Sequence, residues 1–307
     1  MNILLQMPGH AVEPWHAAFV SALPEAAISV WPEGRAIPDY AIVWKPPAEL
    51  FTRFRPAKAI FNLGAGVDSL LAVPTLPADV PVIRLEDAGM AEQMCEYVTY
   101  AVLRAYREMD SYATQQRAGR WQQRERLAKR EFGVGLLGFG VLAHAVAAAL
   151  APFDFPLRGW SRQRRVAPGI QTFAGAEELP AFLAHSRVLV CLLPSTPDTR
   201  GLLGRATLER LPRGAHVINT SRGDIVVDEA LLALLESGHL AGAVLDVFNT
   251  EPLPPDHPFW HHPRIVVTPH VSAATLVADS VAQVAAKIRR FEQGQPVTGV
   301  VDRARGY

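Results

Sequence analysis

Three polar side chains follow three separate apolar runs late in the chain, at places where an open α/β sheet positions its ligands. Arg222 follows the run at 215–219, Glu251 lies shortly after the run at 242–247, and His270 follows the run at 265–267. An arginine can hold a carboxylate through two hydrogen bonds and polarise a neighbouring carbonyl. A histidine beside a carboxylate stays protonated more readily, so His270 next to Glu251 is suited to donate a proton near neutral pH. Singly, each is more readily a surface arginine or a structural histidine, but their shared placement indicates a site.

A second candidate is the stretch Phe132–Val146, where an apolar run, a glycine turn and an Ala-rich run follow one another. Strand, glycine turn and helix in this order are what a dinucleotide-binding fingerprint requires. Gly138 allows a tight turn, Gly140 lets the backbone approach a pyrophosphate, and Ala143 is small enough for the helix to pack on the strand. The helix N-terminus would present N–H groups to the phosphates. The alternative is a glycine-rich turn of any α/β protein.

The end of the next apolar run bears on the choice of dinucleotide. An acidic residue about 20 positions after the glycines normally binds the ribose 2′-OH of NAD, but Trp160-Ser161-Arg162 stands there instead. Ser161 is neutral, and Arg162, with Arg164 and Arg165 close by, could pair with a 2′-phosphate. The sequence therefore predicts a preference for NADPH over NADH. The alternative is a basic surface loop.

Composition limits the other classes of function. The 307 residues favour about two domains, and 49% hydrophobic with 20% charged residues is typical of a globular chain. Thirty basic residues balance thirty acidic ones, which gives no support for binding nucleic acid or an anionic membrane. Two cysteines without CxxC spacing fit a reducing compartment. No run is long enough for a membrane span, and residues 1–8 are typical of a buried strand rather than a signal peptide. The expected location is the cytoplasm.

The elements that must position these residues form two groups of alternating strands and helices, which predict α/β units with parallel sheets. The first group has expected strands at 2–7, 41–44, 59–63 and 81–83, with helices at 11–23 and 69–72. The second has expected strands at 132–137, 157–160, 188–192, 215–219, 242–247 and 265–267, with helices at 143–150 and 228–236. Between the groups, charges at helical spacing from Met90 predict a long helix, and the polar segment 115–130 around Trp121 predicts an arm. A solvated helix and a dimer contact are equally good interpretations of that arm. A final helix is expected at 274–291.

Taken together, the motifs resemble the D-isomer-specific 2-hydroxyacid dehydrogenases over essentially the whole chain. The general family motifs are Gly135-x-x-Gly138-x-Gly140, Asn219-x-x-Arg222-Gly223, Leu245-Asp246-Val247-Phe248-x-x-Glu251-Pro252 and Thr268-Pro269-His270. Further stretches resemble the glyoxylate/hydroxypyruvate reductase A branch: 43–47 (VWKPP), 63–68 (LGAGVD), 159–162 (GWSR) and the tail 301–307 (VDRARGY).

The resemblance implies a role for each matching residue. His270 would protonate the substrate carbonyl oxygen, Glu251 would hold and charge its imidazole, and Arg222 would bind the carboxylate and keto oxygen. Asp246 would hydrogen-bond the nicotinamide carboxamide. Residues of the cofactor site would be Gly138, Phe139, Gly140, Val141, Leu142, Trp160, Ser161, Arg162, Leu193, Pro194, Thr220, Arg222, Asp246 and His270. Residues of the substrate site would be Trp44, Lys45, Gly64, Ala65, Gly66, Arg222 and His270.

Two residues depart from the family pattern. A histidine is common after the tryptophan in this branch, where Lys45 stands here. This leaves open how the far end of the pocket treats the C3 substituent, and Lys45 could accept a second carboxylate. Ser221, where alanine is frequent, is the second departure.

The resemblance also implies an architecture: an α/β fold of two doubly wound parallel-sheet domains, with a Rossmann-type cofactor domain (98–275) inserted into a flavodoxin-like substrate domain (1–97 and 276–307). A cleft between the two would close over the substrate, and the enzyme would be a homodimer through 90–130. The implied reaction is NADPH-dependent reduction of small 2-keto acids, with NADH as a possible cofactor. Alternatives are a dehydrogenase for a bulkier or dicarboxylic substrate and a nucleotide-sensing binding protein of the same fold. No metal is expected, since His257, His261 and His262 are best interpreted as a surface loop.

Overall fold

The computed structural model describes residues 1–8, 12–34, 37–125 and 127–306. Ala11, the expected start of the first helix, and Tyr307 of the quoted tail lie outside these residues, as does Arg126 of the expected arm. The chain forms two compact units, 1–90 with 275–307 and 91–274. The sequence had placed these boundaries at 97/98 and 275/276.

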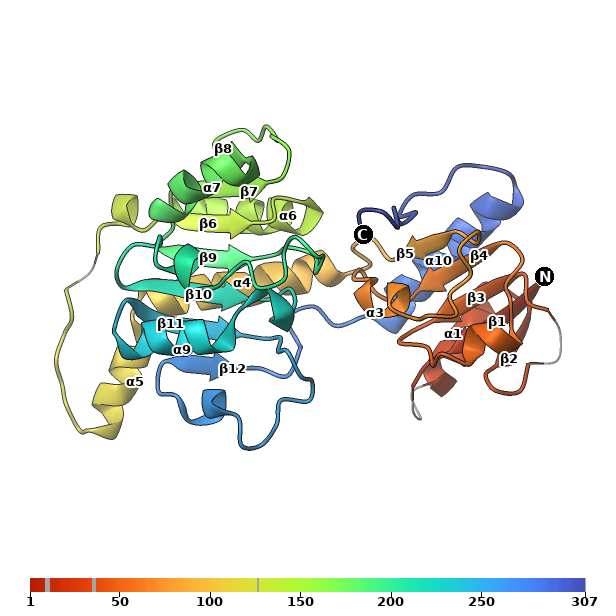
Figure 1. Cartoon of the computed structure of the whole chain (residues 1–307), viewed down its shortest axis with the longest axis horizontal. Helices are drawn as coiled ribbons and strands as arrows, with labels where there is room; N and C mark the ends of the chain where they lie inside the picture. Colours follow the sequence, from red (N-terminus) through yellow and green to blue (C-terminus); the bar gives the residue numbers. More distant parts are fainter. Residues whose placement is uncertain (9–11, 35–36, 126, 307) are drawn as a thin grey trace. The chain divides into compact units, whose positions relative to one another are not determined.

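The first unit is a five-stranded parallel sheet in the order β2-β1-β3-β4-β5, drawn in red and orange in Figure 1. Its strands are β1 (Asn2–Gln6), β2 (Ala27–Val30), β3 (Tyr40–Val43), β4 (Ala59–Asn62) and β5 (Val82–Arg84). Its helices are α1 (Val12–Ala22), α2 (Leu50–Arg53), α3 (Asp68–Leu71) and α10 (Val277–Glu292). This is the 2-1-3-4-5 order of flavodoxin-like sheets, whose direction of winding changes between β1 and β3.

Apolar strands and amphipathic helices explain this unit. Every residue of β3 and β4 is buried, as expected for strands of a parallel sheet covered on both faces. The C-terminal helix α10 packs against α1 and so joins the two ends of the chain in one layer. Its buried residues, which include Val281, Val284 and Ile288, recur at helical spacing.

The second unit is a seven-stranded parallel sheet in the order β12-β11-β10-β9-β6-β7-β8. Its strands are β6 (Val134–Leu137), β7 (Leu157–Ser161), β8 (Gln171–Ala174), β9 (Val188–Cys191), β10 (Ala215–Asn219), β11 (Leu240–Leu245) and β12 (Ile265–Val267). Numbered within the unit, the order is 3-2-1-4-5-6-7, which is the Rossmann order with one added strand. The expected fold class is therefore confirmed in both units.

Helices cover both faces of this sheet. Side chains of α4 (Met90–Tyr106) and α6 (Val141–Leu150) share one core with the sheet. Those of α7 (Gly175–Ala184), α8 (Arg205–Leu208) and α9 (Asp228–Glu236) share the other. Strand β9 shows the alternation, because Val188 and Val190 enter the first core while Leu189 and Cys191 enter the second. All strands run in the same direction, so their carboxyl ends share one edge (Figure 1).

Several details differ from the expectation. The edge strands β2 and β8 were missed because both mix polar and partly exposed residues, without a continuous apolar run. The last helix begins at Val277 rather than at 274. The polar segment begins earlier than expected, with helix α5 (Met109–Arg117) followed by a stretch without regular structure. Short 3₁₀ turns lie at 129–131, 151–153, 223–225 and 258–261.

Candidate active site

The glycine turn after β6 is shaped partly by the protein and partly by something that the protein itself does not supply. Gly138 has φ +102°, and a Cβ there would lie 2.8 Å from the carbonyl of Leu192, so the fold itself requires glycine. A Cβ at Gly140 would meet no described atom within 4 Å. Packing does not explain Gly140, whereas a pyrophosphate against the first turn of α6 would. The turn therefore fits a dinucleotide.

Other residues expected at the cofactor site differ in what they expose. The Phe139 ring is buried against Gly159, and the Trp160 indole is buried with its Nε1 donating to Gly175 O over 2.9 Å. These two can offer only backbone to a ligand. Val141 is 72% exposed at the start of α6, where a ligand could cover it. Leu142 is partly exposed.

The basic loop after β7 has one free side and one committed side. Ser161 Oγ donates to Gln163 O over 2.7 Å, which fixes the turn. Arg164 donates to Thr172 O and pairs with Glu178, so Arg164 is committed to the fold. Arg162 and Arg165 are exposed. No carboxylate follows the strand, and this end of β7 suits a 2′-phosphate better than a 2′-hydroxyl.

The loops after β9 and β10 complete this edge of the sheet. Leu193 is buried and Pro194 is exposed. Thr220 is buried, with Oγ1 lying 3.4 Å from Cys191 O. Asn219 organises the loop that carries Arg222: its amide donates to Arg222 O over 2.9 Å, and its Oδ1 accepts from the N–H and hydroxyl of Ser221. The motif had contained Asn219 without a role, because its function is visible only in these bonds.

Arg222 is partly buried, and its Nη1 donates to Ser221 O over 2.7 Å. The next residue brings two strand ends together, since a Cβ at Gly223 would lie 1.9 Å from the carbonyl carbon of Phe248. Only glycine permits this approach. Arg222 is thereby held beside the loop that carries Glu251.

His270 and Glu251 form a hydrogen-bonded pair. His270 Nδ1 lies 2.8 Å from Glu251 Oε2, while the other oxygen of Glu251 accepts from Phe248 N over 3.1 Å. Both side chains keep solvent exposure, 42% for His270 and 28% for Glu251. Because Nδ1 is engaged, Nε2 is the nitrogen available to a ligand. The two residues that the sequence predicted as a pair are thus in contact.

Asp246 is fully buried, and its carboxylate accepts hydrogen bonds from the residues around His270. The donors are the Thr268 hydroxyl at 2.6 Å and the backbone N–H groups of Val271 and Ser272, both at 2.8 Å. These bonds hold His270 in the left-handed region at φ +54°, which is uncommon for a residue other than glycine. A carboxylate without exposed surface is placed to hold this turn. It is not placed to meet the carboxamide directly, as the resemblance implied.

Tyr97 extends this network and was not identified from the sequence as a site residue. Its hydroxyl lies 2.6 Å from that of Thr268, which in turn donates to Asp246. Burial raises the pKa of Tyr97 to about 12, so the phenol stays protonated at neutral pH. The only signal in the sequence was a tyrosine at helical spacing in α4, and this is equally typical of a core residue.

In the first unit, the loop after β4 presents a run of backbone amides. The Asn62 side chain donates to the carbonyls of Gly64 and Gly66, over 3.0 and 2.9 Å. Within the described residues, no hydrogen bond engages the amides of Gly64, Ala65 and Gly66. Successive free N–H groups form an anion-binding concavity. A Cβ at Gly64 would lie 2.2 Å from Trp44 Cζ3, so the indole lies directly on this loop.

The remaining histidines do not form a metal site. His257 Nε2 lies 3.5 Å from Asp228, and burial lowers the pKa of His262. Among the described residues there is no group of three or more His, Cys, Asp or Glu side chains that could hold a metal ion. The described helices also include none that is long and apolar enough to span a membrane.

Known proteins resemble the chain over its whole length. Residues 99–272 match the family model described as D-isomer specific 2-hydroxyacid dehydrogenase, NAD binding domain. A D-isomer specific 2-hydroxyacid dehydrogenase from Xanthobacter autotrophicus Py2, solved in complex with NADPH and MES, is 42% identical with a TM-score of 0.93, covering 100% of this chain and 99% of that one.

Two further solved structures are similar. An NADPH-dependent glyoxylate/hydroxypyruvate reductase from Sinorhizobium meliloti, in complex with NADP and sulfate, is 36% identical with a TM-score of 0.94. A probable 2-hydroxyacid dehydrogenase from Rhizobium etli CFN 42, with NADP, HEPES and L(+)-tartaric acid, is 33% identical with a TM-score of 0.92. Each comparison covers 100% of this chain and 99% of the other. The chain therefore belongs to the D-isomer-specific 2-hydroxyacid dehydrogenase family of NAD(P)-dependent oxidoreductases.

Proposed function

We propose that this enzyme uses NADPH to reduce small 2-keto acids, glyoxylate and hydroxypyruvate first. The observation that carries the proposal is the hydrogen-bonded pair of His270 and Glu251, at the same sheet edge as the glycine turn and Arg222. When bound, NADPH supplies the hydride that reaches C2 of the keto acid. The relatives solved with NADPH or NADP and the exposed Arg162 after β7 support this cofactor over NADH.

The residues of the second unit divide the remaining work. His270 Nε2 donates the proton to the substrate oxygen as negative charge develops there. Glu251 accepts from Nδ1, which fixes the ring and stabilises its charged form. Arg222 binds the substrate carboxylate and polarises the keto group. Asp246 holds the turn of His270 through Thr268, Val271 and Ser272, which makes it a positioning residue.

The first unit contributes backbone donors. We assign the amides of Gly64, Ala65 and Gly66 to the substrate carboxylate, with the Trp44 indole limiting the space beside them. Free N–H groups bind an anion without adding a titratable group, so this part of the site is insensitive to pH.

A rate panel tests the proposal. NADPH and NADH oxidation are measured with glyoxylate, hydroxypyruvate, pyruvate and phenylpyruvate. We expect glyoxylate and hydroxypyruvate to have the highest kcat/KM and NADPH to exceed NADH by at least tenfold. Equal efficiency with both cofactors would contradict the role of Arg162. Absence of reduction of any 2-keto acid would contradict the function.

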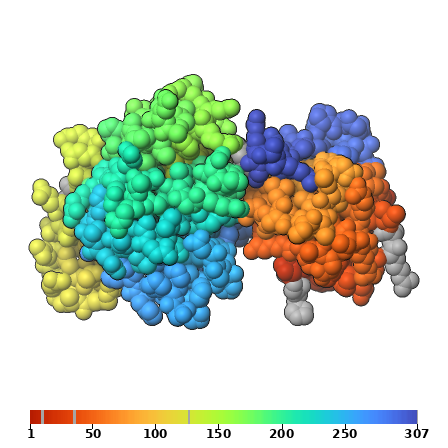
Figure 2. Space-filling view, in the orientation of Figure 1, coloured from red at the N-terminus to blue at the C-terminus, as the bar shows by residue number. Residues whose placement is uncertain are grey.

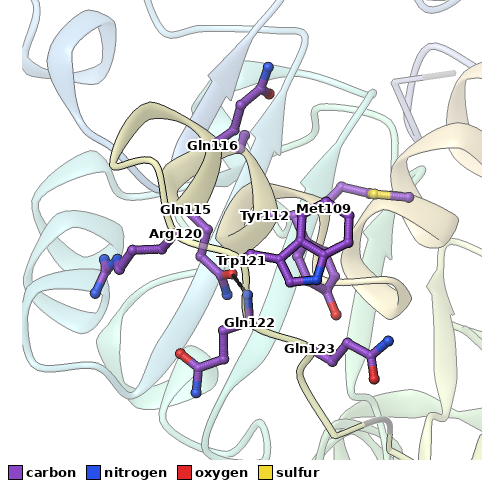
Figure 3. A pocket seen from close by; sticks show the side chains of 9 residues that line it. Met109, Tyr112, Gln115, Gln116, Arg120, Trp121, Gln122 and Gln123 are labelled. Atoms are coloured by element: carbon purple, nitrogen blue, oxygen red, sulfur yellow. Dashed lines mark hydrogen bonds between the residues drawn. The ribbon is translucent and has the colours of Figure 1, made fainter.

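We also propose that the chain forms a homodimer through α5 and the segment after it. Figure 2 shows this segment, in yellow, on the surface of the second unit. Figure 3 shows Trp121 among Met109, Tyr112 and several glutamines around a hollow. The indole is 100% exposed and Met109 is 45% exposed, and apolar side chains so open to water are typical of a contact surface. The Trp121→Ala variant should lower the mass measured by light scattering from dimer to monomer.

A further inference from the structure

One side chain of the first unit has no part in the reaction described above, although it lies beside the proposed substrate loop. Lys45 follows β3, and the sheet order β2-β1-β3-β4-β5 changes its direction of winding between β1 and β3. Open α/β sheets bind ligands outside the carboxyl ends of their strands at this switch point. Lys45 therefore stands where the fold class favours a ligand.

The backbone of Lys45 is held in an unfavourable conformation. Its φ is +44°, in the left-handed region that residues other than glycine seldom adopt. Pro46 follows, and a residue before proline normally favours an extended backbone. A conformation disfavoured on both grounds persists only where the surroundings impose it, and such positions cluster at binding sites.

Contacts with Trp44 fix where the ammonium lies relative to the loop. Trp44 rests on Gly64, and Lys45 Nζ lies 5.8 Å from the centre of the Trp44 ring. No carboxylate among the described residues forms an ion pair with Lys45, although the side chain is exposed. The indole thus separates two groups that attract anions: the amides at 64–66 on one side and a lysine charge on the other.

We propose that Lys45 makes the enzyme favour 2-keto acids that carry a second carboxylate at their far end. This inference rests on the proposed function, in which the amides at 64–66 bind the carboxylate next to the keto group. A substrate held there extends its other end along the indole, and a distal carboxylate then meets the Lys45 ammonium. Glyoxylate has no distal group and gains nothing from this lysine.

The expected effect is moderate. Lys45 is exposed, and ion pairs in water are weak and screened by salt. A charge-assisted hydrogen bond beside an indole is stronger than a fully solvated pair. We expect Lys45 to be worth about tenfold in kcat/KM for the dicarboxylate over a neutral analogue.

The test compares 2-ketoglutarate with 2-ketovalerate, which has the same chain length and a methyl group in place of the distal carboxylate. The quantity of interest is the ratio of their kcat/KM values with NADPH. Lys45→Met should lower this ratio about tenfold, while Lys45→Arg, which keeps the charge, should retain most of it. Raising the salt concentration should lower the ratio in the wild type more than in Lys45→Met.

Lys58→Met is the matched control, because Lys58 precedes β4 at the opposite end of the same sheet and pairs with Glu292. Its ratio should equal that of the wild type. An unchanged ratio in Lys45→Met, with glyoxylate still reduced by the wild type, would overturn this inference and leave the proposed function intact. If the wild type reduces neither glyoxylate nor any other 2-keto acid, both fail.

Discussion

The two units use the same sheet architecture but prepare different kinds of ligand contact. In the second unit, charged side chains at the strand ends are already held by other residues, as Glu251 holds His270 and Asp246 holds the turn around it. In the first unit, the strand ends offer backbone amides at 64–66 and the exposed Lys45. Side chains that must move a proton need fixed orientation and a suitable charge. A surface that only binds a carboxylate needs free donors.

The largest effect should come from removing the proton donor of the second unit. His270→Asn replaces the imidazole with a side chain that tolerates the left-handed backbone at φ +54°, so the turn is kept. We expect kcat for glyoxylate to fall about 10³-fold, in the range that general acid catalysis supplies. The dissociation constant of NADPH, measured by fluorescence, should change little.

His261→Asn is the control for the loss of a histidine, because His261 is exposed and has no role in the proposed reaction. Its kcat should match the wild type. A His270→Asn enzyme with wild-type kcat would remove the proton transfer from the second unit.

A change in the first unit should affect substrate binding instead. In Gly64→Ala, the new Cβ would lie 2.2 Å from Trp44 Cζ3, so the indole or the loop must move. Displaced amides bind the carboxylate less well, and we expect the KM for keto acids to rise ten- to a hundredfold. Steady-state kinetics at saturating NADPH measures this, and an unchanged KM would show that these amides do not bind the substrate.

Within the second unit, the two glycines of the turn separate folding from cofactor binding. Gly140→Ala introduces a Cβ with no described atom within 4 Å, so we expect an unchanged free energy of unfolding but about tenfold weaker NADPH binding. Gly138→Ala places a Cβ at φ +102°, 2.8 Å from the Leu192 carbonyl, and should cost about 1–3 kcal/mol of stability. Denaturant titration and NADPH fluorescence report the two quantities. Equal effects of both variants on stability would contradict this division.

The smallest effect is a pH dependence confined to the second unit. Burial lowers the pKa of His216, on β10, to about 4, which Asp110 and Glu108 oppose only in part. Its stabilisation is complete above the unfolded-state pKa of about 6.5. It is lost as the pH falls toward 4, because the unfolded state then binds the proton more readily. The loss should approach about 3 kcal/mol.

Hydrogen exchange at pH 7 and pH 4.5 tests this dependence, with β10 expected to lose protection and β3 expected to change less. His216→Gln removes the titrating group, so the acid sensitivity of β10 should decrease. Equal loss of protection in β3 and β10 would point to a general acid effect instead.

The sequence predicted most of what depends on residue type. Continuous apolar runs predicted the central strands, and β10 was predicted to the residue at 215–219. The pairing of His270 with Glu251 was also predicted, because two strand ends of one parallel sheet share an edge. Edge strands β2 and β8 were missed, since strands open to water on one side have mixed composition.

What could not be predicted depends on contacts between distant residues. That Asp246 is fully buried, accepting hydrogen bonds from 268, 271 and 272, is set by the packing of the loop after β12. Tyr97 reaches this network from another element, α4, at a sequence separation of 171 from Thr268. The free amides at 64–66 are a property of the backbone, and no residue type marks them.

The central claim is that this enzyme moves a hydride to C2 of a 2-keto acid while His270 supplies the proton. The most direct measurement uses NADPH carrying deuterium at the transferable position of C4, with hydroxypyruvate as substrate. The account predicts D-glycerate with one deuterium at C2 in the wild type, and at most traces of it with His270→Asn over the same time. L-glycerate, glycerate without deuterium, or equal yields from both enzymes would contradict it.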